Sequence, residues 1–161
     1  MGKKIIYVIF FLFCSQIVLA AGGDSGGGSG GSSSVPDFYV EAEIIIKRAK
    51  KIDEKGDTEK AIKLFTSAYE KLLEADKKDK NNPDILNYLG FTLRKMGKYD
   101  EAEKYYLAGL KLKPDHRGIN EYLGELYVKT KRIDLAKERL EVLKNCKCEE
   151  YEELAEVIKK N

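Results

Sequence analysis

Apolar side chains recur at helical spacing through most of the chain, and glycine and proline interrupt that spacing at intervals. The stretch LGFTLRKMGKYDEAEKYYLAGLKLKP, which begins at Leu89, places apolar residues every three or four positions, as one face of an α-helix does. Gly97 divides the stretch and Pro114 ends it, and both residue types commonly follow the end of a helix. It is therefore predicted to be a hairpin of two helices. Read in the same way, the whole chain predicts helices near residues 37–54, 58–77, 84–96, 99–112, 118–130, 133–145 and 149–160.

The chain also repeats its own sequence with a period of 34 residues. The residues NYLG at 87–90 return as EYLG at 121–124, and Ala102 returns as Ala136. A third copy lies upstream at a shift of 41 residues, with seven additional residues in a helix end and polar turn before Pro83. Three copies of one helix pair predict a solenoid, because a single pair cannot bury its own apolar face.

This pattern resembles the tetratricopeptide repeat (TPR), whose small residues let two helices lie close while large residues fill the gaps. The resemblance covers residues 42–150. It is carried by Leu86, Leu89, Gly90, Leu93, Gly97, Tyr99, Ala102, Tyr106, Gly109 and Pro114 in the second unit, by Leu123, Gly124, Tyr127, Ala136 and Leu140 in the third, and by Gly56, Ala61, Phe65 and Ala68 in the first. It implies an all-α fold, a right-handed helical-repeat solenoid of three TPR-like pairs at about residues 42–82, 83–116 and 117–150.

A solenoid also needs a polar-faced cap at its end. Tyr151, Leu154, Ala155 and Ile158 share one helical face, and the glutamates before them suit the positive end of a helix. Residues 149–160 are therefore predicted to form a capping helix. A four-helix bundle or coiled coil is the competing fold, but it predicts a seven-residue repeat and no glycine recurring at longer intervals.

The first residues follow a different pattern. Lys3 and Lys4 precede an apolar stretch, and Ala20 supplies a small residue for cleavage, as in a secretory signal peptide. We expect residues 1–20 to be removed. An uncleaved membrane anchor is the alternative, but Ser15 and Gln16 interrupt the apolar run, which falls short of the roughly 20 residues of a spanning helix.

Residues 21–36 are rich in glycine and serine and are expected to be disordered, because they have almost no apolar side chains to bury. Residues 37–161 then form the TPR domain. The signal predicts an exported protein, in the bacterial periplasm.

The net charge argues against two classes of binding partner. The chain has 29 basic and 27 acidic residues, and loss of Lys3 and Lys4 with the signal leaves these numbers equal. A neutral chain has no electrostatic reason to bind nucleic acid or an anionic membrane surface. We expect neither after signal cleavage.

The sequence offers little that indicates catalysis. The one histidine, His116, falls in a turn with no serine or cysteine patterned for activation by it, and is expected to be exposed. Acidic residues alternate with lysines, as they do on solvated helix faces. We expect no enzyme activity, no catalytic residue and no cofactor.

Cys146 and Cys148 are the cysteines that stay after signal cleavage. They are a disulfide candidate in an oxidising compartment, and two unlinked thiols at a helix end are the alternative. Two soft ligands could suit Cu(I), whereas zinc would need four ligands. We predict no metal site.

The resemblance implies that the first helices of the pairs line a concave groove that binds a segment of a partner. The implied groove residues are Ile46 and Lys50 in the first pair, Asn87, Phe91 and Arg94 in the second, and Glu121, Glu125 and Val128 in the third. Phe91 is either a partner anchor or packed against a neighbouring helix. Arg94 is either a binding residue or only a surface partner of Glu125.

The resemblance also excludes one ligand. The family's clamp for a chaperone tail is absent, because its positions are occupied by Ile46 and Lys50 in the first unit, Tyr88 in the second, and Gly118 and Tyr122 in the third. The expected function is a non-enzymatic, monomeric protein–protein interaction module of the cell envelope that binds another protein or a peptide segment. The alternative is a structural or assembly factor, built into an envelope complex through its convex face or cap.

Overall fold

The computed structural model describes residues 37–161. The signal peptide predicted for residues 1–20 and the disordered segment predicted for residues 21–36 lie outside the described residues. The helices are α1 (Phe38–Asp53), α2 (Thr58–Lys78), α3 (Pro83–Lys95), α4 (Tyr99–Leu112), α5 (Arg117–Lys129), α6 (Ile133–Leu143) and α7 (Glu149–Lys159). Each lies within two residues of the helix that the sequence predicts. None of these helices is both long enough and apolar enough to cross a membrane.

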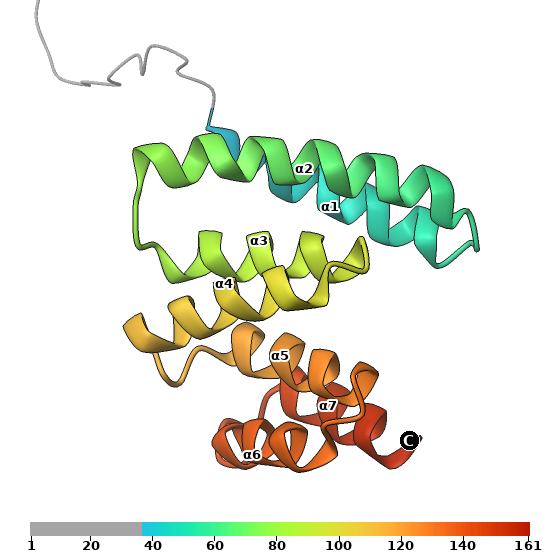
Figure 1. The fold of residues 1–161 in the computed structure, drawn as a ribbon, viewed down its shortest axis with the longest axis vertical. Helices are drawn as coiled ribbons and strands as arrows, with labels where there is room; N and C mark the ends of the chain where they lie inside the picture. Colours follow the sequence, from blue (N-terminus) through green and yellow to red (C-terminus); the bar gives the residue numbers. More distant parts are fainter. Residues whose placement is uncertain (1–36) are drawn as a thin grey trace, which may run out of the picture. The chain divides into compact units, whose positions relative to one another are not determined.

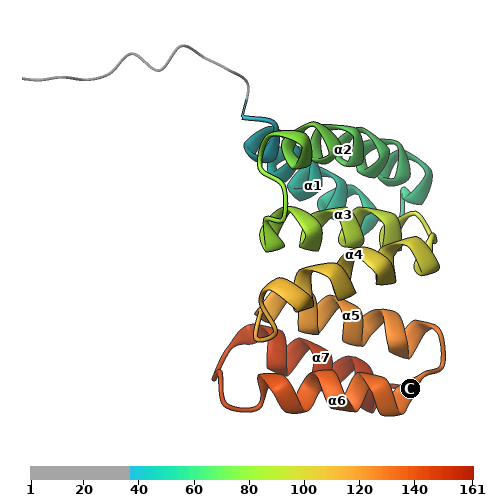
Figure 2. The same ribbon diagram turned by 60° about the vertical axis from the view of Figure 1, so that its left-hand side comes forward.

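The helices form pairs that stack in chain order, as Figures 1 and 2 show. The pairs are α1 with α2, α3 with α4, and α5 with α6, and the first helix of each later pair also packs on the second helix of the preceding pair. Helix α7 packs against both α5 and α6. The described residues confirm the predicted fold class, an all-α helical-repeat solenoid that ends in a capping helix.

Two glycines let helices lie close together, but against different partners. A Cβ atom on Gly90 would lie 2.5 Å from the buried ring of Tyr106. A Cβ atom on Gly124, one period later, would lie 2.5 Å from the side chain of Leu154 in α7. The third pair has the smaller Leu140 at the position of Tyr106. The capping helix therefore supplies the side chain that packs on the glycine of the third pair.

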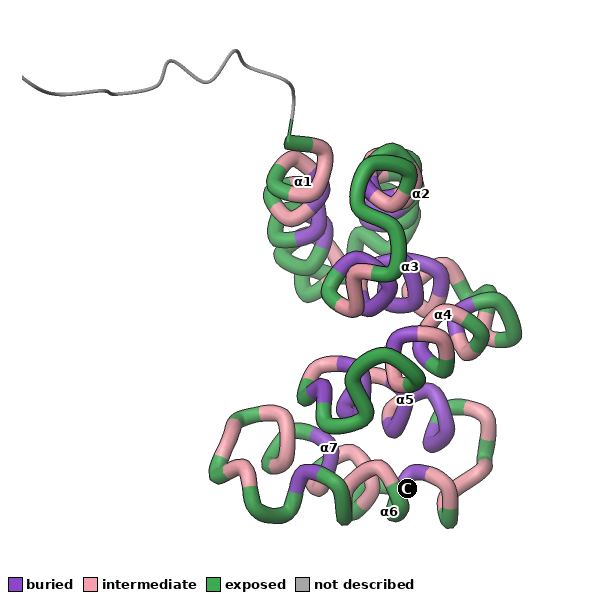
Figure 3. The backbone as a smooth tube through the Cα atoms, turned by 90° about the vertical axis from the view of Figure 1, so that its left-hand side faces the viewer, coloured by how far each residue is buried: buried purple, intermediate pink, exposed green. Residues whose placement is uncertain are grey.

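Buried residues concentrate in α3 and α5, because α3 packs against α2, α4 and α5, and α5 packs against α3, α4, α6 and α7 (Figure 3). The buried residues of α1 are Ala42, Ile46 and Ala49, one face of the helix only. The core therefore runs through the middle of the stack, and residues on α3 and α5 are the ones most completely covered.

His116 is buried, which corrects the expectation that it is an exposed turn residue. The backbone N–H of Ile119 donates to its Nδ1 at 3.2 Å, so the imidazole caps α5. Because Nδ1 is the acceptor, we assign the ring hydrogen to Nε2, which lies 2.9 Å from a carboxylate oxygen of Asp84. His116 thus ties the third pair to the start of α3.

Cys146 and Cys148 form a disulfide in the turn between α6 and α7, with their Cα atoms 5.2 Å apart. That separation lies within the range that disulfides accept. The bridge stands at the entry to the capping helix, where it restricts the turn.

Candidate functional site

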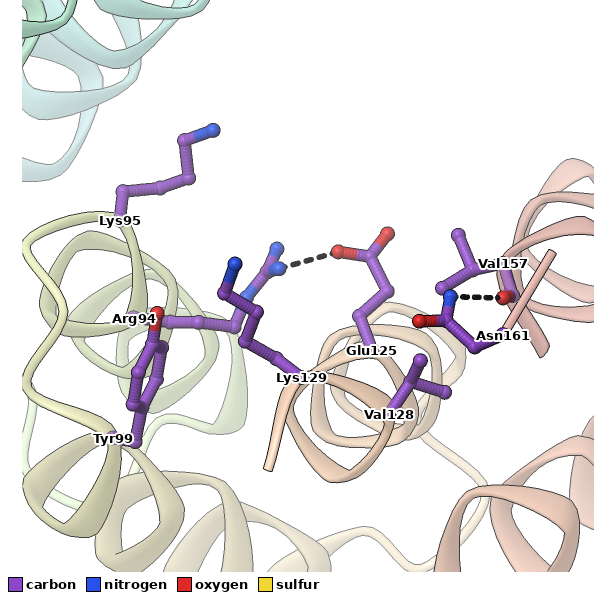
Figure 4. A pocket seen from close by; sticks show the side chains of 8 residues that line it. All are labelled: Arg94, Lys95, Tyr99, Glu125, Val128, Lys129, Val157 and Asn161. Carbon is purple, nitrogen blue, oxygen red and sulfur yellow. Dashed lines mark hydrogen bonds and ion pairs between the residues drawn. The ribbon is translucent and has the colours of Figure 1, made fainter. Parts of the chain in front are cut away.

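The C-terminal turns of α3, α5 and α7 surround a pocket of about 450 Å³. Its lining residues, drawn in Figure 4, are Arg94, Lys95, Tyr99, Glu125, Val128, Lys129, Val157 and Asn161. The walls come from three successive layers of the stack. A peptide segment in this pocket would therefore contact the second pair, the third pair and the capping helix together.

An ion pair joins α3 to α5 in the pocket (Figure 4). A guanidinium nitrogen of Arg94 lies 2.5 Å from Oε2 of Glu125, and the two side chains are only 14% and 21% exposed. The Arg94 guanidinium also lies 5.5 Å from the ring centre of Phe91 and 5.3 Å from that of Tyr122. Breaking such a shielded pair would leave a charge without a partner, which is costly. The pair therefore fixes the spacing of the two helices at the pocket.

Phe91 is 3% exposed and does not reach the pocket. Its ring centre lies 5.8 Å from that of Phe65 in α2 and 4.9 Å from that of Tyr122 in α5. The ammonium group of Lys50 in α1 lies 5.6 Å from the same ring. Phe91 is thus packed against neighbouring helices, which is one of the two alternatives that the sequence leaves open.

The predicted groove residues divide between the pocket and the core. Arg94, Glu125 and Val128 line the pocket, although Val128 is only 2% exposed. Those buried away from it are Ile46, Asn87, Phe91 and Glu121, and Lys50 is exposed on α1. The burial of these four side chains and of Val128 corrects the expectation that they are presented to a partner. The position of a residue in the repeat predicts the helix face on which it lies. How far that face is buried depends on the neighbouring helices.

Five pocket residues were not predicted: Lys95, Tyr99, Lys129, Val157 and Asn161. Lys95, Tyr99 and Lys129 lie at helix ends, and Val157 and Asn161 lie in and just after the capping helix. The repeat pattern, by contrast, assigns the groove to positions along the first helices. A signal existed for Val157, because it follows Leu154 by three residues and so belongs near the apolar face of the cap.

Three carboxylates meet beside the pocket, where α7 packs on α5. Glu121, Glu125 and Glu153 each offer an oxygen, and these oxygens lie within 4.8 Å of one another. Burial, a hydrogen bond with Glu153 and the charges of Glu125 and Glu153 raise the pKa of Glu121 to about 9. Glu121 therefore keeps a proton at neutral pH. The sequence gives no sign that Glu153 approaches the other two.

The family model of the tetratricopeptide repeat matches residues 83–116, which span the second helix pair. The comparison with curated proteins finds no match. The sequence match identifies one TPR unit in the middle of the stack and supports the resemblance that the sequence pattern carries.

Solved structures resemble the described fold at low identity. The translocator chaperone SycD of Yersinia enterocolitica type III secretion aligns with a TM-score of 0.51 and 19% identity, over 85% of this chain and 93% of that chain. The TPR domain of Sgt2 from Aspergillus fumigatus aligns with a TM-score of 0.49 and 19% identity, over 74% of this chain and 78% of that chain. The second TPR domain of human RPAP3, in complex with an HSP70 peptide, aligns with a TM-score of 0.48 and 21% identity, over 77% of this chain and 99% of that chain. The likeness to SycD shows that the fold is shared.

Proposed function

We propose that this chain is a non-enzymatic protein-interaction module, which holds a segment of a partner protein in the pocket formed by α3, α5 and α7. The pocket carries the proposal, because it opens across three layers of the stack and combines apolar with charged walls. The TPR match of the second pair supports it, since the resemblance implies partner binding by the first helices of the pairs.

The pocket walls indicate the chemistry of the segment. The half-buried Val157 offers apolar surface to one side chain of the partner, beside Val128, which is only 2% exposed. Arg94 is already paired with Glu125, so neither offers a free charge. Lys129 is exposed and makes no ion pair within residues 37–161, so it is available to an acidic group of the segment. An exposed pair of that kind contributes about 0–1 kcal/mol, and most of the affinity would come from apolar burial.

A non-enzymatic role agrees with the structural contacts that His116, Cys146 and Cys148 make. His116 caps a helix and contacts Asp84, and Cys146 is bonded to Cys148. Imidazoles and cysteine sulfurs are common bases and nucleophiles, and here the imidazole and both sulfurs are engaged in structural contacts.

The place of action that we propose is the bacterial periplasm, with a mature chain that begins at Ala21. This proposal rests on the charged, apolar and small residues of the first 20 positions. Measuring the intact mass of protein recovered from the periplasm tests it. Recovery of the uncleaved chain in the membrane fraction would contradict it and favour the anchor.

A second candidate function has one observation in its favour. The outer helices α2 and α4 leave two adjoining pockets of about 380 and 500 Å³ between them, which share Leu86 and Ala108. Tyr69, Tyr105 and Leu112 supply further apolar surface there. These pockets favour the assembly-factor alternative, in which the outer face is built into a larger complex.

Site-specific photocrosslinking in cells separates the two functions. A crosslinking residue is placed at Lys129, which lines the α3–α5–α7 pocket, or at Lys104, which lines one of the two outer pockets. Both side chains are exposed, so neither substitution disturbs the core. A specific protein adduct from position 129 alone is the expected result. An adduct from position 104 with none from position 129 would overturn the proposed function in favour of the assembly factor.

A further inference from the structure

The two ends of the described stack differ in how they are covered. Helix α1 begins the stack and α7 ends it (Figures 1 and 2). The terminal repeats of such a stack need a polar outer face to stay soluble. The third pair has the capping helix α7, whereas α1 packs chiefly on α2 and carries no cap of its own within residues 37–161. The outer face of α1 is therefore a surface on which a further helix could pack.

The outer face of α1 is apolar in its first half and basic in its second. Val40, Ile44, Lys47 and Lys51 follow one another at spacings of four, three and four residues, so they form one exposed stripe, the α1 stripe. Val40 is 46% exposed, and Ile44, at 63%, is the most exposed large apolar side chain of the described residues. The ion pairs that α1 forms within residues 37–161 use its acidic side chains alone. Both lysines of the stripe are thus available to a partner.

The outer face of α7 has the reverse order of charge. Glu149, Glu152, Glu156 and Lys159 follow one another at spacings of three, four and three residues, and all are exposed. They form a second stripe, the α7 stripe, on the side of the helix opposite the buried Leu154. Its first two glutamates form no ion pair within residues 37–161, and the third pairs with a neighbour on its own helix. The α7 stripe is therefore acidic at the start of the helix and basic at its end.

The two stripes are complementary when the helices run antiparallel. The lysines at the end of α1 would then lie beside Glu149 and Glu152 at the start of α7, and Asp37, just before α1, would lie beside Lys159. Parallel packing would instead bring the lysines of α1 to the basic end of α7. The methylene stems of long charged side chains cover apolar surface, and those of α7 would cover the apolar half of the α1 stripe. Antiparallel packing is also the arrangement of the two helices within each pair (Figures 1 and 2).

We propose that copies of this chain associate head to tail, with the α1 stripe of one copy packed antiparallel on the α7 stripe of the next. The two surfaces differ, so the contact is heterologous and repeats along a row of copies. One pair of helix faces is a small interface, so the association is weak and depends on concentration. The monomer that the sequence predicts is then the dilute state.

The proposal stands apart from the proposed function. None of the residues of the α1 stripe or the α7 stripe lines the α3–α5–α7 pocket. Self-association is also measured without any partner protein, so its failure would leave the proposed function untouched.

Sedimentation velocity of the full chain over a range of concentrations, at low and at high NaCl, tests the association. We expect the average sedimentation coefficient to rise with concentration at low salt and to rise much less at high salt, because salt screens exposed charges. The double variant Lys47→Glu with Lys51→Glu should abolish the rise, and so should Glu149→Lys with Glu152→Lys. The chain with all four substitutions again has opposite charges on its two stripes, so it should recover the rise.

Lys104→Glu with Lys111→Glu is the matched control, since both lysines are exposed on α4 and the pair makes the same change of charge. It should associate as the parent chain does. A parent chain that stays monomeric at low salt and high concentration would overturn the proposal. So would equal loss of association in the control, or failure of the fourfold variant to recover it.

Two other occupants of the α1 stripe have their own outcomes. Loss of association in the α1 double variant with none in the α7 double variant would overturn the head-to-tail contact in favour of two α1 helices packed together. Sedimentation of a monomeric parent chain with anionic phospholipid vesicles, lost in the α1 double variant, would overturn it in favour of a membrane surface.

Discussion

Phe91 lies on the face of α3 that the repeat assigns to partner binding, yet α2 and α5 cover it. The rings of Phe65 and Tyr122 lie 5.8 and 4.9 Å from its own, so its apolar surface is already used inside the chain. A large residue at this position closes the gap between helices that a smaller one would leave open to a ligand. The binding surface that we propose lies instead at the helix ends, where Val157 and Lys129 line the pocket.

Phe91→Ala is predicted to lower the free energy of unfolding by about 3–5 kcal/mol, because it leaves a cavity among buried rings. Urea denaturation measures the effect. Lys129→Ala, at an exposed position of the pocket rim, should change stability by no more than about 0.5 kcal/mol. Unchanged stability of Phe91→Ala with loss of a bound partner would instead identify Phe91 as an anchor.

Glu121 gives a pH dependence of defined sign. Its pKa is raised from 4.5 to about 9 by burial and by the neighbouring carboxylates. Between these values the folded chain keeps a proton that the unfolded chain has lost, so the stability from this group falls as pH rises. Glu121→Gln is predicted to flatten the decline of Tm between pH 5 and pH 9. Parallel Tm curves for parent and variant would contradict this account.

At the scale of the elements, the turn after the first helix has the same left-handed backbone conformation in the second and third pairs. Gly97 has a φ of 79°, and Lys131, one period later, has a φ of 64°. Left-handed backbone costs a residue with a Cβ roughly 1–2 kcal/mol, whereas glycine adopts it freely. The third pair thus keeps the turn of the repeat with a residue that is poorly suited to it.

Lys131→Gly is predicted to stabilise the chain by about 0.5–1 kcal/mol, the relief of strain less the greater freedom of glycine in the unfolded state. Lys131 is exposed and forms no ion pair within residues 37–161, so no contact is lost. Gly97→Ala is the matched opposite and should destabilise. Thermal melting of both variants checks that Lys131→Gly raises Tm and Gly97→Ala lowers it. A lower Tm for Lys131→Gly would exclude strain at this turn.

The turn before the capping helix carries the disulfide. Protein purified without reductant is predicted to show no thiol at Cys146 or Cys148 that reacts with an alkylating agent. Reduction should lower Tm only slightly, because the closed loop is very short and removes little entropy from the unfolded chain. Mass spectrometry after alkylation counts the free thiols. Two labelled cysteines in the unreduced protein would favour the unlinked alternative.

At the scale of the whole molecule, the sequence pattern predicts the helices because spacing and breaking residues are local properties. Gly97 and Pro114 mark helix ends, and the recurrence of Gly90 as Gly124 marks the repeat. The pocket and the carboxylate cluster depend on where α7 packs, which no local pattern specifies. The contact of Leu154 with Gly124 positions α7 on α5. This position places Val157 in the pocket and Glu153 beside Glu121 and Glu125.

The capping helix is predicted to control the stability of its own end of the stack. Leu154 is fully buried against Gly124, so Leu154→Ala should cost about 2–5 kcal/mol locally. In a solenoid each repeat contacts only its neighbours, so the loss should spread from α7 to α5 and α6 before it reaches α1 and α2. Hydrogen exchange followed by mass spectrometry measures this order. The matched variant Leu72→Ala, at a fully buried position of α2, should loosen the first pair instead. Equal acceleration of exchange in all seven described helices by both variants would contradict this prediction. It would show that the stack opens as one unit, so that the cap stabilises all the described helices and not only those around the pocket.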